Sequence, residues 1–200
     1  YTIITNIGES HIEFFGSREG IAKAKFEITN GMKKDGFFVY NGDEPLLKEL
    51  VENSSINATS CGENSYNDII LENYTITRDK IDFKLNIDKN SFSTTLKGKH
   101  NLFNIMFAVA IAKKIGLTNE EIRHAIDNIS KITNMRLESI TYGEDSLIIN
   151  DAYNASPTSM KAAVDVISDL NDFEFKTLVL GSMFELGPNE VEYHSGIGTY

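Results

Sequence analysis

The stretch Leu147-Ile148-Ile149-Asn150-Asp151-Ala152-Tyr153-Asn154-Ala155-Ser156-Pro157 passes from an apolar run through a polar loop to a helix start. Ser156 is a favourable N-cap, and Pro157 at the first helical position lacks only an N–H that would be unpaired anyway. The amphipathic run 158–170 continues the helix. In open α/β sheets, ligands bind just beyond the carboxyl ends of strands. The stretch therefore predicts an α/β fold whose polar loop lies at the ligand-binding edge, although a capped turn of this kind needs no ligand.

Composition restricts the class of protein. The chain has 200 residues, of which 41% are hydrophobic and 24% charged, as is ordinary for globular proteins. The net charge of −10 argues against nucleic acid as a partner. A single cysteine, Cys61, excludes an intrachain disulfide framework and a thiolate metal cluster. No apolar run approaches the roughly 20 residues that a membrane span needs, so we expect a cytoplasmic protein.

The first hundred residues alternate strand and helix patterns and then change character. Buried strands are expected at 1–5, 37–40 and 56–60, with helices at 18–32 and at 44–52, the second capped by Asp43. Such βαβ order predicts a parallel sheet. The runs 69–77, 81–87 and 92–96 instead alternate between apolar and polar residues, which predicts an antiparallel meander that covers or extends that sheet.

The second hundred residues contain helix boundaries and a new α/β unit. A helix is expected at 101–115, stopped by Gly116, and the capping box of Thr118 and Glu121 starts another that ends near Ile129. A linker at 130–136, a hairpin of 137–141 with 147–150 around residues 143–145, and a strand at 177–180 should follow. We therefore divide the chain into domains 1–133 and 134–200.

Several polar residues could carry chemistry, and each has a plainer explanation. His11, with Glu9 and Glu13 nearby, could bind a metal or act as an acid or base, but it could equally be a surface histidine. Lys23 and Lys25 are two apart on a helix, so only one of them can face a given site.

Other candidates lie at a helix start and in the linker. Asn101 and Asn104 share a helix face and could cap the helix or pair with an adenine edge. Arg136 suits phosphate binding through its planar guanidinium, or a linker salt bridge. The loop Gly181–Gly187, with His194 on the helix behind it, suggests either a tight turn or a close backbone approach.

Taken together and in this order, the motifs resemble those of the Mur ligases. The matching segments run from residue 5 to 187: Thr5-Asn6-Ile7-Gly8-x-x-His11, Ala24-Lys25-x-Glu27-Ile28, Gly98-x-His100-Asn101-x-x-Asn104, Met135-Arg136-Leu137-Glu138, Asp151-Ala152-Tyr153-Asn154-Ala155-x-Pro157 and Met183-x-Glu185-Leu186-Gly187. The last two favour the branch of the family that adds D-alanyl-D-alanine. The resemblance implies a partial parallel-sheet ATP-binding domain with the meander, followed by the start of a Rossmann-like domain.

The resemblance also implies a reaction and its partners. The substrates would be UDP-N-acetylmuramoyl-tripeptide and D-alanyl-D-alanine, joined through an acyl phosphate at the expense of ATP in peptidoglycan precursor synthesis. ATP and Mg²⁺ would be the cofactors, and a monomer is expected. Lys25 would be carbamylated to become an oxygen ligand of Mg²⁺, and His11 would lie near a second Mg²⁺. The residues that would contact the nucleotide are Asn101, Asn104, Arg136, Asp151, Tyr153 and Asn154.

The sequence departs from the family pattern in one respect. The family's ATP-binding domain starts with a P-loop upstream of the strand that corresponds to Tyr1, and no G-x-x-x-x-G-K-[ST] occurs in these 200 residues. We therefore expect a piece of a longer enzyme that is inactive alone, because the triphosphate would lack its cradle. Two alternatives remain: a related ligase such as folylpolyglutamate synthase, against which Tyr153-Asn154-Ala155 argues, and a non-catalytic nucleotide-binding module.

Overall fold

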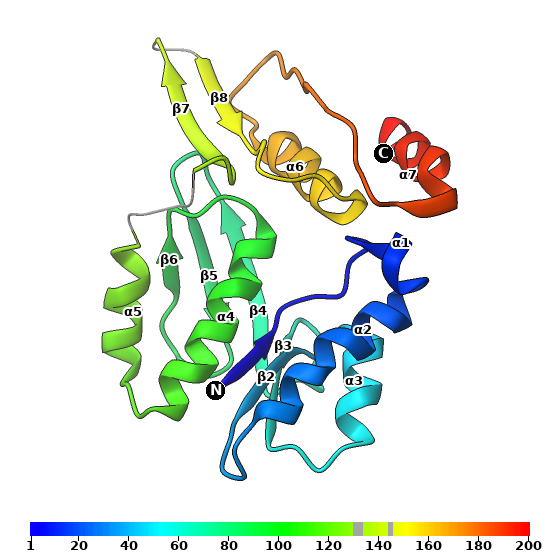
Figure 1. Cartoon of the computed structure of the whole chain (residues 1–200). Helices are drawn as coiled ribbons and strands as arrows, with labels where there is room; N and C mark the ends of the chain where they lie inside the picture. The colour runs from blue at the N-terminus through cyan, green and yellow to red at the C-terminus, as the bar shows by residue number, and fades with distance from the viewer. Residues whose placement is uncertain (130–133, 144–145) are drawn as a thin grey trace.

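The computed structural model describes residues 1–129, 134–143 and 146–200 (Figure 1). Its larger sheet has six strands in sequence order. The first four strands pair in parallel, and the fourth strand also begins an antiparallel meander with the fifth and sixth. The strands are β1 (Thr2–Ile4), β2 (Phe38–Asn41), β3 (Ala58–Gly62), β4 (Ile69–Ile76), β5 (Ile81–Leu85) and β6 (Phe92–Thr94). The sequence predicted that the meander would either cover or extend the parallel sheet, and the structure shows that it extends the sheet.

Strand β2 shows why the sheet has two covered faces. Its residues Phe38, Val39 and Tyr40 are all buried, as expected for a central parallel strand. Val39 packs in one core with α4 (Lys99–Lys114) and α5 (Asn119–Asp127). Phe38 and Tyr40 point the other way and pack with α2 (Arg18–Phe26) and α3 (Pro45–Glu52). Successive side chains of the strand thus hold helices on opposite faces.

The helix boundaries agree with the sequence apart from local differences. The capping box of Thr118 and Glu121 forms, and Gly116 takes a φ of +93° after α4, both as predicted. The cap of α3 is Glu44, whose side chain accepts from the Leu46 N–H. The expectation of Asp43 there was wrong, because the Asp43 carboxylate instead accepts bonds from the segment that follows β3.

Two other differences concern the first helices. The helix expected at 18–32 tightens after Phe26 into a 3₁₀ turn, η1 (Glu27–Gly31), where the Thr29 hydroxyl donates to the Phe26 carbonyl at 2.7 Å. The loop before it contains a single helical turn, α1 (Ile12–Phe15). Both changes keep Lys25 on α2, as the sequence placed it.

The second half of the chain begins with a two-stranded hairpin. It is made of β7 (Glu138–Tyr142) and β8 (Ser146–Asn150), as predicted, with Gly143 at a φ of +69° in the turn. Residues 144–145 of the turn and 130–133 of the expected linker lie outside the described residues. Helix α6 (Pro157–Asp169) starts at the predicted cap, where Ser156 and Ser159 form a capping box. The 3₁₀ turn η2 (Gly187–Asn189) and α7 (Glu190–Gly198) follow.

The strand expected at 177–180 is wrong. Residues 177–186 form no regular element, and the side chain of Val179 is 94% exposed. A strand forms only where its backbone finds a partner, and β7 and β8 pair with each other. Neither sheet of the described residues includes this segment.

In the part of the chain that the structure describes, no helix is both long and apolar enough to cross a membrane.

The Phe38 ring should be a large contributor to stability. It is fully buried, contacts the Phe26 ring edge-on with centroids 5.8 Å apart, and stacks on Tyr40 at 5.7 Å. We expect Phe38→Ala to lower the free energy of unfolding by about 3–5 kcal/mol, because it leaves a cavity between β2 and α2. Urea unfolding followed by circular dichroism measures this loss. Phe38→Leu is the control and should lose much less; an alanine variant as stable as the parent would contradict this packing.

Candidate functional site

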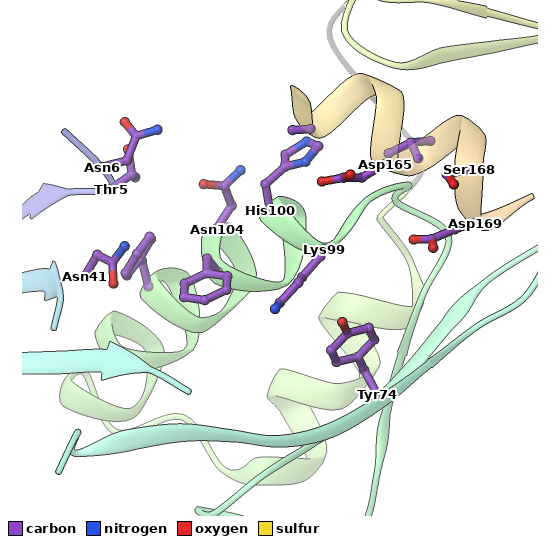
Figure 2. A pocket seen from close by; sticks show the side chains of 14 residues that line it. Thr5, Asn6, Asn41, Tyr74, Lys99, His100, Asn104, Asp165, Ser168 and Asp169 are labelled. Carbon is purple, nitrogen blue, oxygen red and sulfur yellow. The ribbon is translucent and has the colours of Figure 1, made fainter. Parts of the chain in front are cut away.

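A cavity of about 620 Å³ opens at the carboxyl edge of the parallel strands, between the sheet, the start of α4 and one side of α6. Figure 2 shows polar side chains from all of these elements around it. The residues that line it are Thr5 and Asn6 after β1, Asn41 of β2, Tyr74 of β4, Lys99, His100, Phe103, Asn104 and Phe107 of α4, and Ala162, Asp165, Val166, Ser168 and Asp169 of α6. Aromatic surface and amide groups together are suited to a flat heterocycle.

Of the two asparagines predicted at the helix start, the structure places Asn104 in the wall of this cavity and Asn101 behind it. The Asn101 amide nitrogen donates to the Lys97 carbonyl at 2.7 Å, which caps the turn that precedes α4. The Asn101 side-chain oxygen accepts from the Asn104 amide nitrogen at 3.1 Å. Asn101 therefore orients Asn104, whose own oxygen is left available to a ligand.

A glycine allows α6 to close the cavity. Gly98 is the N-cap of α4 and has a φ of +85°, which other residues rarely adopt. A Cβ at this position would lie 2.8 Å from a methyl carbon of Val166 on α6. Helix α6 can therefore approach α4 this closely only because residue 98 has no side chain.

Lys99 and Glu63 form an ion pair at the cavity that the sequence analysis missed. The Lys99 ammonium lies 2.8 Å from a Glu63 carboxylate oxygen and 5.6 Å from the centre of the Tyr74 ring. Burial by itself would lower the pKa of Lys99, but the hydrogen bond and charge of Glu63 outweigh it and raise the pKa. Lys99 therefore stays a cation beside the cavity, where it can face an anionic or electron-rich ligand.

Asp43 holds Glu63 in place for this pair. Its carboxylate accepts from the backbone N–H groups of Glu63 at 2.6 Å and Asn64 at 3.3 Å, and from the side-chain amide of Asn67 at 2.7 Å. These bonds lower the pKa of Asp43, although its partial burial acts in the opposite direction. The segment after β3 is thus tied to the end of β2.

The predicted residues of the second half form a separate cluster outside the cavity lining. The Asp151 carboxylate accepts from the Leu137 N–H at 3.0 Å, and the Tyr153 N–H donates to the Met135 carbonyl at 3.1 Å. The Arg136 guanidinium lies over the Tyr153 ring at 4.2 Å. The loop after β8 is therefore fastened to the segment that precedes β7.

The same cluster leaves its functional groups accessible. Tyr153 is 60% exposed and Asn154 is also exposed. Among the ion pairs of the described residues none includes Arg136, so the linker salt bridge that we considered does not form there. Desolvation lowers the pKa of His100, and the negative charge of Asp151 acts in the opposite direction.

His11 and Lys25 lie around the loop that follows β1. His11 is the N-cap of α1 with a φ of 64°, and its Nδ1 pairs with the carboxylate of Glu185. The Lys25 ammonium donates to the Asn6 carbonyl at 3.1 Å, and partial burial lowers the pKa of Lys25. Glu185 was not among the predicted site residues, although its motif Met183-x-Glu185-Leu186-Gly187 had been noted.

The metal site that the resemblance implied can be tested against these groups. Over residues 1–129, 134–143 and 146–200, no three His, Cys, Asp or Glu side chains gather as a preformed metal site. Carbamylation of a lysine needs a neutral amine, and the lowered pKa of Lys25 makes that form more accessible. The environment of Lys25 therefore fits a modified lysine that would supply the missing oxygen ligand. The roles of Lys25 and His11 stay predictions.

We expect Lys25 to titrate below the usual lysine value of about 10.4, because partial desolvation disfavours its charged form. Reductive methylation with ¹³C-formaldehyde and an NMR titration measure the midpoint, and Lys25→Arg assigns the resonance. The amine should become neutral, and hence reactive, at lower pH than an exposed lysine. A midpoint at or above the usual value would show that the site does not activate the amine.

Two protein-family models match the two halves of the chain. Residues 1–112 match the family model described as Mur ligase middle domain, and residues 135–200 match the Mur ligase, glutamate ligase domain. These ranges fall within our divisions 1–133 and 134–200, whose boundary stays a prediction.

Similar proteins and structures carry related names. The chain is 44% identical to a UDP-N-acetylmuramoyl-tripeptide–D-alanyl-D-alanine ligase of Bacillus subtilis over 98% of its own length, which is 42% of that protein. The fold matches MurF from Acinetobacter baumannii with a TM-score of 0.89 at 30% identity, covering 98% of this chain and 43% of the other. It also matches a MurF ligase from Thermotoga maritima in complex with ADP, with a TM-score of 0.84 at 24% identity and coverage of 98% and 45%.

The chain thus spans less than half the length of these relatives. Because the middle-domain model alone matches residues 1–112, more than half of the sequence, the chain belongs to the Mur ligase family.

Proposed function

We propose that this protein is an ATP-dependent ligase that joins D-alanyl-D-alanine to UDP-N-acetylmuramoyl-tripeptide in cytoplasmic peptidoglycan precursor synthesis. The observation that carries the proposal is the cavity between the sheet, α4 and α6, with the Asn104 amide in its wall. The 44% identical relative from Bacillus subtilis carries the name of this activity.

The cavity suits the base of ATP. Its volume of about 620 Å³ accommodates a nucleoside. The free oxygen of Asn104 can accept from an exocyclic amino group, and Phe103 and Phe107 offer apolar surface to a ring. A Mur ligase of the same fold was solved with ADP, which supports a nucleotide here.

The sugar and phosphates would extend toward the loop after β8. Asp151 offers a carboxylate to a ribose hydroxyl, and Arg136 offers its guanidinium to a phosphate. The Arg136 guanidinium carbon lies 4.2 Å from the centre of the Tyr153 ring, a cation–π contact that orients it. Exposed Asn154 can reach the same ligand from the adjacent position.

Metal ions would be held at the loop after β1. His11 and the carbamylated form of Lys25 are the groups of this chain that would hold them. Bound Mg²⁺ neutralises the negative charge that gathers when a carboxylate approaches a triphosphate. The Asn6 carbonyl, which accepts from Lys25 at 3.1 Å, keeps that side chain directed at the loop.

The proposed reaction has two steps. A carboxylate oxygen of the tripeptide attacks the γ-phosphorus of ATP, and ADP leaves. The amine of D-alanyl-D-alanine then attacks the acyl carbon of the resulting acyl phosphate, loses a proton, and releases phosphate.

The full-length gene product tests this proposal: ADP and phosphate should form in equal amounts only when both substrates are present. Acceptance of a different amine from a panel of acceptors would assign the chain to another branch of the family.

Asn104→Ala in that protein tests the base-binding role. We expect the KM for ATP to rise about tenfold with little change in kcat, because one hydrogen bond to the base is lost in ground and transition states alike. Steady-state kinetics with saturating peptide substrates measure both constants. Asn90→Ala, in an exposed turn, is the matched control and should behave like the parent. An unchanged KM for ATP in Asn104→Ala would show that the base does not bind in this cavity.

A further inference from the structure

Glu185 makes two contacts with the loop after β1, at a place outside the cavity lining. Its carboxylate pairs with Nδ1 of His11, and its backbone carbonyl accepts from the Glu13 N–H at 3.2 Å. Figure 1 shows α1 beside the segment that leads into α7. One residue of the second half thus holds both the ring of His11 and the backbone of α1.

Neighbouring contacts strengthen this junction. The Thr158 hydroxyl, in the first turn of α6, donates to a Glu9 carboxylate oxygen at 2.6 Å. Gly187 has a φ of +66°, which favours glycine, and a Cβ there would lie 3.6 Å from the Glu13 Cα, an ordinary van der Waals distance that places the two segments in contact. The junction therefore has three polar contacts, two made by Glu185 and one made independently by Thr158.

The backbone is unusual on both sides of the contact. His11 has a φ of 64° and Glu185 a φ of 60°, a left-handed conformation that residues other than glycine adopt infrequently. Such conformations persist where surrounding structure requires them. Among the described residues, Met135 and Leu137 are the other non-glycine residues with a positive φ. His11 and Glu185 differ from these two in being partners of one ion pair.

Glu185 is rigidly attached to the second half of the chain. Its neighbours Met183 and Leu186 are buried in the core that also contains Met160 and Ile197. The Met183 N–H donates to Nε2 of His194 at 2.9 Å, so α7 fixes the segment from behind. Any movement of this half must therefore move the Glu185 carboxylate with it.

The loop on the other side is equally fixed to the larger sheet. Ile7 is buried, and the Arg18 guanidinium donates to the Ile7 carbonyl at 2.9 Å while it pairs with Glu44 at 2.6 Å. The Asn6 carbonyl accepts from Lys25. The contact of Glu185 with His11 therefore also restrains the loop after β1, whose Asn6 carbonyl orients Lys25.

We propose that Glu185 is a positioning residue that docks the second half of the chain onto the loop after β1 and sets the orientation of His11. Without the pair, the two halves separate more freely and His11 loses its fixed rotamer. The consequence for catalysis rests on the proposed ligase function, whereas the docking itself does not.

Distance measurements test the docking directly. Spin labels are attached in the full-length gene product at Glu49→Cys on α3 and Ser195→Cys on α7, both exposed positions on helices. Cys61 is buried, and burial raises the pKa of its thiol to about 12, so it does not take up label. Electron–electron double resonance then reports the separation of the halves, with and without a non-hydrolysable ATP analogue.

We expect the parent to populate the separation seen in the structure, and Glu185→Ala to lose that population in favour of longer and broader distances. Glu185→Gln keeps the length and an oxygen acceptor for the His11 N–H, so it should restore most of the short separation. Thr158→Val removes the second contact and should broaden the distribution less. Glu192→Gln, exposed on α7, is the matched control and should match the parent. Equal distributions for parent and Glu185→Ala would overturn the proposal.

Kinetics separate positioning from folding. We expect Glu185→Ala to lower kcat about tenfold or more, because small misplacements of reacting groups are costly, with an unchanged melting temperature since Glu185 is part-exposed. Glu185→Gln should recover most of kcat. If the parent shows no ligase activity, the proposed function fails, and the distance measurement still decides the docking. If the parent is active and Glu185→Ala is equally active with unchanged distances, the positioning role fails alone.

Discussion

The parallel pairing of β1 with β2 is the constraint on which the rest of the structure depends. Because Thr2 aligns with Phe38 and Ile4 with Tyr40, both strands end at the same edge of the sheet. That edge receives the loop with Asn6 and His11 from one strand, and Asn41 with Asp43 from the other. The start of α4 reaches the same edge, so groups distant in sequence meet there.

The second half of the chain completes this edge. Helix α6 supplies the opposite wall of the cavity, and its approach depends on the absence of a side chain at Gly98. The pairing of Glu185 with His11 lies at another point of the same junction. A nucleotide bound at the edge would therefore contact both halves, which is how a change in their separation could control access to it.

Local signals in the sequence predicted most of the fold. The capping box at Thr118, the N-cap at Ser156 and the helix stop at Gly116 depend on neighbours within a few residues, and all three are confirmed. The strand expected at 177–180 was wrong because strand formation depends on a partner that local patterning does not reveal. The cap of α3 moved to Glu44 because a distant segment engages Asp43.

In the candidate site, too, local motifs were predictable from the sequence, whereas contacts between distant segments were not. The family motifs contain Asn104, Lys25 and Asp151, and each of these residues lies where polar groups converge. Glu63 could not be found in this way, because its pair with Lys99 joins residues far apart in the sequence and neither has a distinctive local pattern. The bonds of Asn101 to the Lys97 carbonyl and to Asn104 also needed the structure, whereas a direct contact of Asn101 with the nucleotide stays a prediction.

We propose that the base of ATP occupies the cavity between α4 and α6, while its sugar and phosphates extend toward the loop after β8. A crystal structure of the full-length gene product with Mg²⁺ and a non-hydrolysable ATP analogue tests it most directly. We expect density for the base against the Asn104 side chain, with Asp151 at the ribose. Density for the nucleotide elsewhere, with this cavity filled only by water, would contradict it.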